Sequence, residues 1–438
     1  MKNFSSVGIQ APEILIPNDQ IDLEKWAVAA CDQYTSQPEY WNTVEKIVGQ
    51  SPSTYHLILP EVYLGTKKEQ IHASQINLLM EKYLKMNYFK IIDGMIYIER
   101  YFDNSVRKGL IAALDLEQYD FTDGSCSLIR ATEGTIIARL PPRIKIRQDA
   151  LIEIPHILAL IDDPKMSIIE PISKSSNGKE LIYDFDLMQN GGHLRGYHIV
   201  SSDLEEKIIQ ALETLILPAN QSKKYGINKN APPLLFAIGD GNHSLATAKA
   251  VWDKIKHGAP ENHPARYALV EIVNIHDEGI VFEPIHRLLK GIKEDWFLSV
   301  KNYFNHKLNI QKISNFKALA SAVSKNLSED QLFGAFDKSN FWLVSIKEPN
   351  HTLSVGSIQN CIDNLILNGQ IKDVDYIHGD EIILELGTAP ENAGIYLPAM
   401  RKDFLFRSVI KDGALPRKTF SMGEAHQKRF YLECRKIK

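Results

Sequence analysis

The segment "PPLLFAIGDGNHSLATAKAVWDKIK", which begins at Pro232, changes its hydrophobic period in the middle and constrains the fold more than any other stretch. Residues 234–238 form a short apolar run behind two prolines, which is typical of a buried strand. From Ser244 on, apolar residues recur with the spacing of one helical face: Leu245, Ala248, Trp252 and Ile255. The sequence therefore predicts a strand that ends near Ile238, a turn, and a helix that begins near Ser244.

The turn carries more polar chemistry than a chain reversal needs. Its glycines can adopt a positive φ or let another molecule approach the backbone, and Asp240 or Asn242 can cap the first N–H groups of the helix. Unpaired amides at the positive end of a helix suit an anion. A capped turn without a ligand is the alternative, but Asp, Asn, His and Ser follow almost consecutively, so we favour a functional site. The candidates are Asp240 and His243 for catalysis and Gly239, Gly241, Asn242 and Ser244 for phosphate binding.

Composition sets wide limits on the class of protein. With 438 residues, 44% hydrophobic and 24% charged, the chain resembles a soluble globular protein of two domains or one large domain. Its net charge of −4 gives no electrostatic reason to expect a nucleic-acid or membrane partner. The four cysteines lie far apart without a CxxC pair, so neither a zinc site nor a disulfide framework is indicated and a reducing cytoplasm is expected. No segment approaches a membrane-spanning run.

Helical and strand patterns are mixed along the chain without a steady βαβ rhythm, which predicts an α+β (mixed α/β) fold. Residues 69–86 show the period of an amphipathic helix. Hairpins are expected around Asp93-Gly94 and around residues 277–279. The main α/β region with the turn is expected to span residues 1–291, and a second lobe residues 292–438, whose C-terminal segment could return to the site.

Four arginines gather in the stretch "SLIRATEGTIIARLPPRIKIRQDA" beside Glu133. Arginine presents a planar fork to phosphate or carboxylate, so Arg130 and Arg143 are candidates for holding a dianion. The alternative is a solvated strand face with Arg–Glu pairs, and the pattern favours neither.

Three motifs beyond residue 280 add further candidates. "EPIHRLL" contains His286 and Arg287, and "YIHGDEI" contains His378. A lone buried histidine is more often a core residue than a catalyst, so His286 ranks above His378 and both rank below His243. Lys418 in "LPRKTFSM" could close over a phosphate, although a basic surface tail has the same pattern.

Several familiar chemistries lack their motifs. The sequence has no GxxxxGK[ST] loop, and Ser244 stands where a dinucleotide fingerprint needs its third glycine. HExxH and GxSxG are also missing. Ordinary P-loop kinase, Rossmann, zinc-protease and α/β-hydrolase functions are therefore poor interpretations.

The motifs "AIGDGNHSLATAKA", "EPIHRLL", "YIHGDEI" and "LPRKTFSM", in this order over most of the chain, resemble the uncharacterised prokaryotic family DUF1015. Many relatives carry Asp-Gly-His-His-Arg where this chain has Asp-Gly-Asn-His-Ser, so only Asp240, Gly241 and His243 match. The motif is similar to that of the ParB/sulfiredoxin-like group, which binds nucleotide phosphates and includes free-serine kinases that use ADP. The resemblance implies a ParB/sulfiredoxin-like nucleotide-binding core with an additional lobe.

The resemblance also implies site residues and a reaction. "ACDQYTS" occupies the place of the family's Pro-Tyr-Asp segment, which makes Asp32 a second acidic candidate. Arg287 or an arginine of residues 130–147 could replace the missing arginine. Genes of the family often lie beside those for phosphoserine synthesis, which points to phosphoserine or serine as the substrate.

We therefore expect phosphoryl transfer on a small phosphorylated metabolite, as a phosphatase or a nucleotide-dependent phosphotransferase, with Mg²⁺ and ADP as expected cofactors. Asp32 or Asp240 would be a base or metal ligand, and His243 would contact phosphate or shuttle a proton. A module that senses a nucleotide without turnover is the first alternative, and a structural protein with a capped turn is the second.

Overall fold

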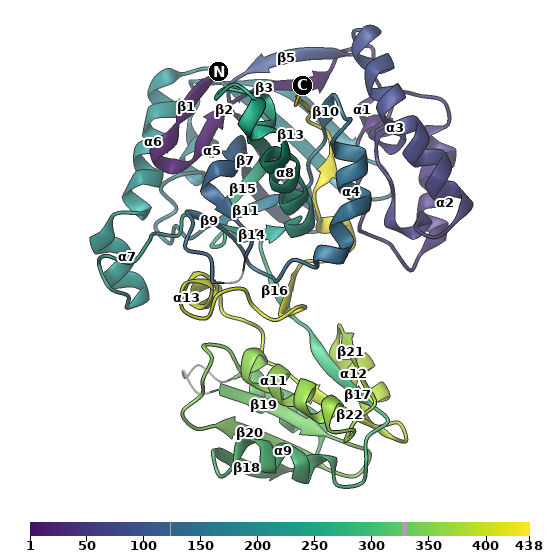
Figure 1. The fold of residues 1–438 in the computed structure, drawn as a ribbon, viewed down its shortest axis with the longest axis vertical. Coiled ribbons are helices and arrows are strands. Elements are labelled where there is room, and N and C mark those ends of the chain that lie inside the picture. Colours follow the sequence, from purple (N-terminus) through teal and green to yellow (C-terminus); the bar gives the residue numbers. More distant parts are fainter. Residues whose placement is uncertain (123, 326–330) are drawn as a thin grey trace. The chain divides into compact units, whose positions relative to one another are not determined.

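The computed structural model describes residues 1–122, 124–325 and 331–438, and the chain divides into two compact units. Unit 1 comprises Met1–Ile280 and Gly423–Lys438, and unit 2 comprises Val281–Met422 (Figure 1). This division differs from the expected one after residue 291, because β17 (His286–Lys290) lies inside the sheet of unit 2. Unit 2 is inserted into the sequence of unit 1.

Unit 1 is built on a large mixed sheet, as the mixed pattern of the sequence predicts. In spatial order its main strands are β12 (Lys179–Leu187), β13 (Gly192–Ile199), β6 (Ile96–Phe102), β7 (Ser105–Asp115), β15 (Tyr267–Asn274), β11 (Leu158–Ile161), β14 (Phe236–Asp240), β9 (Ile129–Ala131) and β8 (Tyr119–Asp120). Two short strands, β1 (Lys2–Phe4) and β2 (Ile9–Ala11), extend it beside β7. Smaller pairs are formed by β3 (Glu13–Pro17) with β5 (Phe89–Asp93), β4 (Val28–Ala29) with β24 (Phe430–Tyr431), and β10 (Ile152–Glu153) with β25 (Arg435–Lys436).

Helices cover the sheet because its central strands are apolar on both faces. On β7, Leu110 and Ala112 belong to one core and Ile111 to the other, as the period of two requires. The helices of unit 1 are α1 (Leu23–Trp26), α2 (Pro38–Val48), α3 (Lys67–Lys85), α4 (Leu140–Arg147), α5 (Glu170–Lys174), α6 (Ser202–Leu215), α7 (Pro218–Tyr225) and α8 (Asn242–Ile255). Helix α3 confirms the amphipathic pattern of residues 69–86. In Figure 1, α4 and α8 lie side by side in front of the strands.

Strand directions decide which loops meet at one edge of the sheet. Strands β14, β9 and β8 are parallel to one another, and β14 is antiparallel to β11. The carboxyl ends of β14 and β9 therefore lie at the same edge as the residues that precede β11. Such an edge is where open α/β sheets bind ligands.

Both expected hairpins are wrong. Strand β5 pairs with β3, whereas β6 pairs with β7 and β13, so the turn at Asp93-Gly94 joins strands of different sheets. The turn at residues 277–279 likewise leads from β15 in unit 1 to β16 (Phe282–Pro284) and β17 in unit 2. The Asp277 carboxylate accepts hydrogen bonds from the Gly279 and Lys108 amides, which stabilise this turn without strand pairing across it.

The described residues of unit 2 form a six-stranded sheet with helices on both faces. Its strands in spatial order are β18 (Leu308–Ile313), β20 (Phe341–Ile346), β19 (Gln331–Phe336), β22 (Asn392–Tyr396), β17 and β21 (Asp373–Ile377). Its helices are α9 (Trp296–Phe304), α10 (Phe316–Ser324), α11 (Ser354–Leu367), α12 (Asp380–Gly387) and α13 (Lys402–Asp412). Leu289 of β17 packs into one core and Leu288 into the other. Strand β23 (Phe420–Met422) pairs with β16.

A buried charge network holds the C-terminal segment on the sheet of unit 1. Glu271 of β15 is ion-paired with Arg107 of β7 at 3.1 Å and with Arg429 at 2.8 Å, and Arg429 also pairs with Glu433 at 2.5 Å. Burial alone would raise the pKa of Glu271, but the two arginine charges outweigh it and hold that pKa below its ordinary value. Arg107 also donates to the Gln427 carbonyl. The segment is thus fixed by charge-assisted hydrogen bonds.

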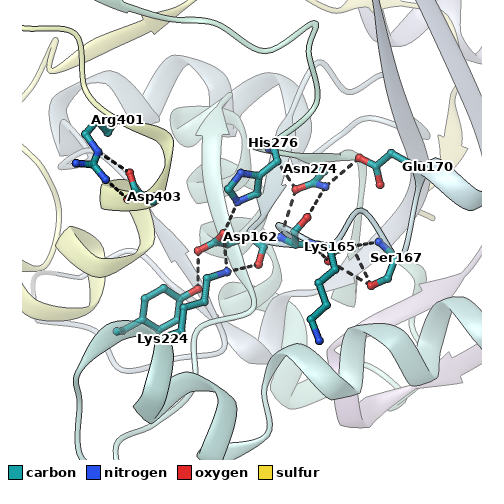
Figure 2. Close-up of polar contacts among 11 residues, drawn as sticks. Asp162, Lys165, Ser167, Glu170, Lys224, Asn274, His276, Arg401 and Asp403 are labelled. Carbon is teal, nitrogen blue, oxygen red and sulfur yellow. Dashed lines mark hydrogen bonds and ion pairs between the residues drawn. The ribbon is translucent and has the colours of Figure 1, made fainter. Parts of the chain in front are cut away.

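At the opposite edge of the sheet from the carboxyl end of β14, polar side chains join the ends of β11 and β15 (Figure 2). The Asp162 carboxylate contacts the Lys224 ammonium at 2.6 Å and His276 at 2.7 Å. Asn274 donates to the Asp163 carbonyl and to Glu170 Oε1 at 2.9 Å. The other carboxyl oxygen of Glu170 has no hydrogen-bond partner among the described residues. Burial raises the pKa of Glu170, and the hydrogen bond from Asn274 opposes this shift.

Glu170→Gln is expected to leave the protein at least as stable as the wild type at neutral pH. A carboxyl whose pKa is raised by folding contributes stability below its unfolded value, about 4.3, and this contribution is lost as the pH rises through the folded value. Glutamine keeps the acceptor for Asn274 but cannot ionise. Denaturant unfolding between about pH 4 and pH 8 should show less loss of stability for the variant than for the wild type. The exposed Glu180→Gln is the control, and identical pH profiles for all three proteins would contradict this assignment.

Among the residues that the structure describes, no helix combines the length and the apolar character needed to span a bilayer.

Candidate functional site

The strand, turn and helix predicted around Asp240 are present, with slightly different ends. Strand β14 runs on to Asp240 and α8 begins at Asn242, so that Gly241 alone separates them. The capping prediction is wrong, because no side chain in the described structure caps α8. The Asp240 carboxylate accepts from the Gly241 amide at 2.8 Å, and Asn242 donates to the Ile238 carbonyl at 3.1 Å. The amides of the first helical turn therefore have no side-chain cap, and they lie at the positive end of the helix.

Gly241 is required by both its backbone conformation and its neighbour. Its φ of 76° lies in the left-handed region, which side chains with a Cβ rarely adopt. A Cβ at this position would lie 2.9 Å from Ile157 Cγ1 and 3.0 Å from Ile157 Cα. Close packing against the residue that precedes β11 thus fixes the turn.

Gly241→Ala is expected to lower the free energy of unfolding by about 1–3 kcal/mol, because it adds a clash with Ile157 to the backbone strain. Gly65→Ala is the matched control, since Gly65 has a φ of 77° and nothing lies within 4 Å of the point that a Cβ would occupy there. It should show the strain alone, about 1 kcal/mol. Equal losses of stability in denaturant would contradict a role for the Ile157 contact.

Asp240 is paired with a residue that sequence analysis did not single out. Lys428, from the segment that returns after unit 2, places its ammonium 3.4 Å from the Asp240 carboxylate, with side chains 12% and 19% exposed. Burial would raise the pKa of Asp240, but Lys428, assisted by His156 and the Gly241 amide, outweighs it and lowers that pKa. Asp240 is therefore ionised at neutral pH.

His243 is positioned as a neutral hydrogen-bond donor. The Ile136 amide donates to its Nε2 at 3.3 Å, so the proton of the neutral imidazole resides on Nδ1. Burial lowers the pKa of His243, the charges of Arg143 and Arg139 lower it further, and Asp32 opposes them. The ring thus offers Nδ1–H at neutral pH, which suits contact with a phosphate oxygen better than proton shuttling.

The residues whose charges shift the pKa of His243 lie near the turn: Asp32, Arg139 and Arg143. Arg143 on α4 contacts Glu61, and its guanidinium donates to the Arg139 carbonyl at 2.8 Å. Asp32 follows β4, and its Oδ2 lies 3.7 Å from His156 Nε2. His156 precedes β11, at the edge where β14 ends. Three cations, Lys428, Arg139 and Arg143, thus gather near the start of α8 together with the carboxylates of Asp32, Asp240 and Glu61.

The other candidate cations lie elsewhere. The Arg130 guanidinium donates to the carbonyls of Ser127, Pro232 and Pro233, at the opposite end of β14 from Asp240. Of the arginines at residues 130–147, Arg139 and Arg143 therefore lie near the turn, as expected for a replacement of the missing arginine, whereas Arg130 does not. Its donors are engaged in fixing the start of that strand.

Three further candidates belong to unit 2: His286, Arg287 and Lys418. The structure gives His286 and Arg287 packing roles. His286 is fully buried, is stacked on Tyr396, and accepts from the Leu397 amide at 3.1 Å. Burial lowers the pKa of His286 to about 4, so it is a neutral core residue. Arg287, also fully buried, donates to the carbonyls of Ile285, Arg417 and Lys418. These contacts anchor the "LPRKTFSM" segment to β17.

The site residues that sequence analysis missed are His156, Lys428 and Tyr431. His156 follows a proline in no recognisable motif, and the other two lie in the C-terminal "KRFYLEC". Each is far in sequence from the turn, and only the charge of Lys428 and the ring chemistry of His156 could have drawn attention to them.

The donor set fits Mg²⁺ only together with a phosphorylated ligand. In the described parts of the chain, no group of three His, Cys, Asp or Glu side chains is placed to hold a metal ion. Mg²⁺ in nucleotide sites often uses one or two carboxylates and completes its shell with phosphate oxygens and water. Asp240 could supply such a carboxylate.

Solved structures that match this chain share little sequence with it and have TM-scores below 0.5. A free serine kinase mutant in complex with AMP has a TM-score of 0.40 and 10% identity, covering 75% of this chain and 92% of its own. The corresponding complex with ADP has a TM-score of 0.39 and 10% identity, covering 77% and 95%. SbnI from Staphylococcus aureus, with a C-terminal truncation, has a TM-score of 0.33 and 10% identity, covering 72% and 82%.

No curated protein matches the chain. The model of a family described as "Protein of unknown function (DUF1015)" matches residues 15–365, which include the whole of the turn and most of both units. The resemblance to this family is confirmed, with the first two of the four motifs inside the matched range, and the chain belongs to the DUF1015 family.

Proposed function

We propose that unit 1 catalyses phosphoryl transfer involving a small phosphorylated metabolite, phosphoserine or serine, with an adenine nucleotide as the second substrate. The observation that carries the proposal is the set of charges around the start of α8, where Lys428, Arg139 and Arg143 surround an uncapped helix N-terminus. Phosphoryl transfer depends mainly on positioning and charge neutralisation, which such a site supplies.

The phosphate would bind at the amides of the first turn of α8, with the Ser244 hydroxyl and His243 Nδ1–H as additional donors. The arginines and Lys428 would neutralise the charge that develops on the equatorial oxygens. A Mg²⁺ ion bound by Asp240 and phosphate would add charge neutralisation. Gly239 and Gly241 would let the ligand approach the backbone.

The match of Asp240, Gly241 and His243 to the ParB/sulfiredoxin-like motif supports a nucleotide-binding core of that type for unit 1. Ser244 replaces the arginine of that motif, and the three cations around α8 are the groups available to take its place.

Assays of the purified full chain test the proposal. The protein is incubated with phosphoserine and Mg²⁺, with and without ADP or AMP, and with serine and ADP or ATP. Free serine, inorganic phosphate and nucleotides are quantified by ³¹P NMR and chromatography. We expect turnover of at least one pair, and thermal stabilisation by the nucleotide of about 2.7 kcal/mol at a hundred times its dissociation constant. Nucleotide binding without any turnover would favour the sensing function, and neither binding nor turnover would contradict both.

A further inference from the structure

Asp32, His156 and Tyr431 form a line of contacts beside the turn. Asp32 Oδ2 lies 3.7 Å from His156 Nε2, and His156 Nδ1 lies 2.9 Å from the Tyr431 hydroxyl. The Tyr431 hydroxyl in turn accepts from the Cys31 amide at 3.3 Å. His156 and Tyr431 are buried, whereas the Asp32 side chain is 31% exposed. The line thus runs from the protein interior to a partly exposed carboxylate.

The chemistry of the three groups decides the proton positions. A carboxylate is an acceptor only, so His156 Nε2 faces it favourably when it carries the proton. In the neutral imidazole Nδ1 is then an acceptor, and the Tyr431 O–H donates to it. The Cys31 amide donates to a lone pair of the Tyr431 hydroxyl oxygen, so the hydroxyl proton remains available for Nδ1. Such an arrangement fixes both the tautomer and the orientation of the ring.

The carboxylates of Asp240 and Asp32 differ in how far their oxygens are already engaged by other groups of the protein. The Asp240 carboxylate is already engaged by the Lys428 ammonium at 3.4 Å and by the Gly241 amide at 2.8 Å. Asp32 has no cationic Lys or Arg partner in the described structure, and apart from His156 it accepts only from Gln33 Nε2 at 3.0 Å. It is also the more exposed of the two.

We propose that Asp32 is the general base of the reaction and that His156 and Tyr431 are its positioning residues. The proposal rests on the proposed phosphoryl transfer. As the acceptor hydroxyl attacks phosphorus, its O–H bond breaks and the proton passes to the Asp32 carboxylate, while the bond from phosphorus to the leaving oxygen breaks. The leaving phosphate keeps that electron pair. His156 keeps its Nε2 proton throughout and holds the carboxylate toward the ligand.

The positioning is tested in the free protein, without any substrate. Two-bond ¹H–¹⁵N correlation spectra of protein with ¹⁵N-labelled histidine, recorded near pH 8 where ordinary imidazoles are neutral, identify the tautomer of each ring. We expect His156, assigned by its loss in His156→Gln, to be the Nε2–H form. Tyr431→Phe should introduce the Nδ1–H form, whereas Tyr97→Phe, which removes the buried hydroxyl that donates to Glu99, should not. An Nδ1–H ring in the wild type would overturn the positioning.

The base is tested by kinetics with the substrate pair that the wild type turns over. Asp32→Asn should lower kcat by about 10²–10⁴-fold. His156→Asn should lower kcat by about tenfold or more with KM little changed, and His156→Gln, whose amide can reach the Nε2 position, should restore part of the loss. Unchanged kcat in Asp32→Asn overturns the base, and equal kcat in the two His156 variants overturns its positioning role. If the wild type shows no turnover, the proposed function fails and the assignment of Asp32 as base falls with it. The tautomer of His156 then still decides whether Tyr431 and Asp32 hold the ring as described.

Discussion

Asp240→Asn lowers kcat by roughly a hundredfold or more if the carboxylate supports phosphoryl transfer, while the chain still folds. Asparagine keeps an oxygen to accept from the Gly241 amide, so the geometry of the turn is retained. It removes the negative charge that holds Lys428 and that could bind Mg²⁺. The measurement is steady-state kinetics with the active substrate pair, together with denaturant unfolding to confirm that the variant is folded.

Asp253→Asn is the matched control for this variant. Asp253 lies on the same helix and also pairs with lysines, Lys249 at 3.1 Å and Lys256 at 2.9 Å, but its side chain is 40% exposed and lies at the far end of α8. Its substitution should change stability by no more than about 0.5 kcal/mol and leave turnover unchanged. Full activity of Asp240→Asn would remove Asp240 from the mechanism.

Glu271→Ala should have the largest effect on stability, a loss of about 3–5 kcal/mol, because it leaves Arg107 and Arg429 buried without their shared carboxylate. The three side chains are 1–4% exposed, so water cannot replace the lost partner. Arg107 also holds the Gln427 carbonyl and Arg429 the Pro155 carbonyl, next to Lys428 and His156. Nucleotide affinity should therefore fall together with stability.

The midpoint of chemical denaturation, followed by fluorescence, measures the effect on stability. Glu81→Ala is the control, since Glu81 and Lys85 form an exposed pair on α3 that should contribute less than about 0.5 kcal/mol. A Glu271→Ala protein within about 1 kcal/mol of the wild type would show that the two arginines find water or other partners.

The local pattern of the sequence was sufficient for some features of this fold. The change of period at residues 234–256 predicted β14 and α8, because hydrophobic periodicity depends on which face of each element is buried. The hairpin at Asp93-Gly94 failed because a turn dipeptide reports the local conformation, whereas strand pairing is decided by distant partners. The prediction that Asp240 caps α8 also failed, because its carboxylate instead pairs with the distant Lys428 and accepts from the Gly241 amide.

The same limit applies to the candidate site. Asp240, Gly241 and His243 lie within four consecutive residues, so the sequence alone predicted that they belong to one site. Asp32 came only from the family resemblance. His156 and Lys428 meet Asp240 through the antiparallel register of β11 with β14 and through the return of the chain after unit 2, neither of which leaves a local signal.

The insertion of unit 2 has a consequence for synthesis on the ribosome. Residues 423–438, which supply Lys428, Tyr431 and Arg429 of the buried network, are translated after the whole of unit 2. Domains generally fold as they emerge, N-terminal parts first. Nascent unit 1 must therefore wait with Glu271 lacking Arg429 and Asp240 lacking Lys428 while unit 2 is made, and it completes these contacts only when residues 423–438 have left the exit tunnel.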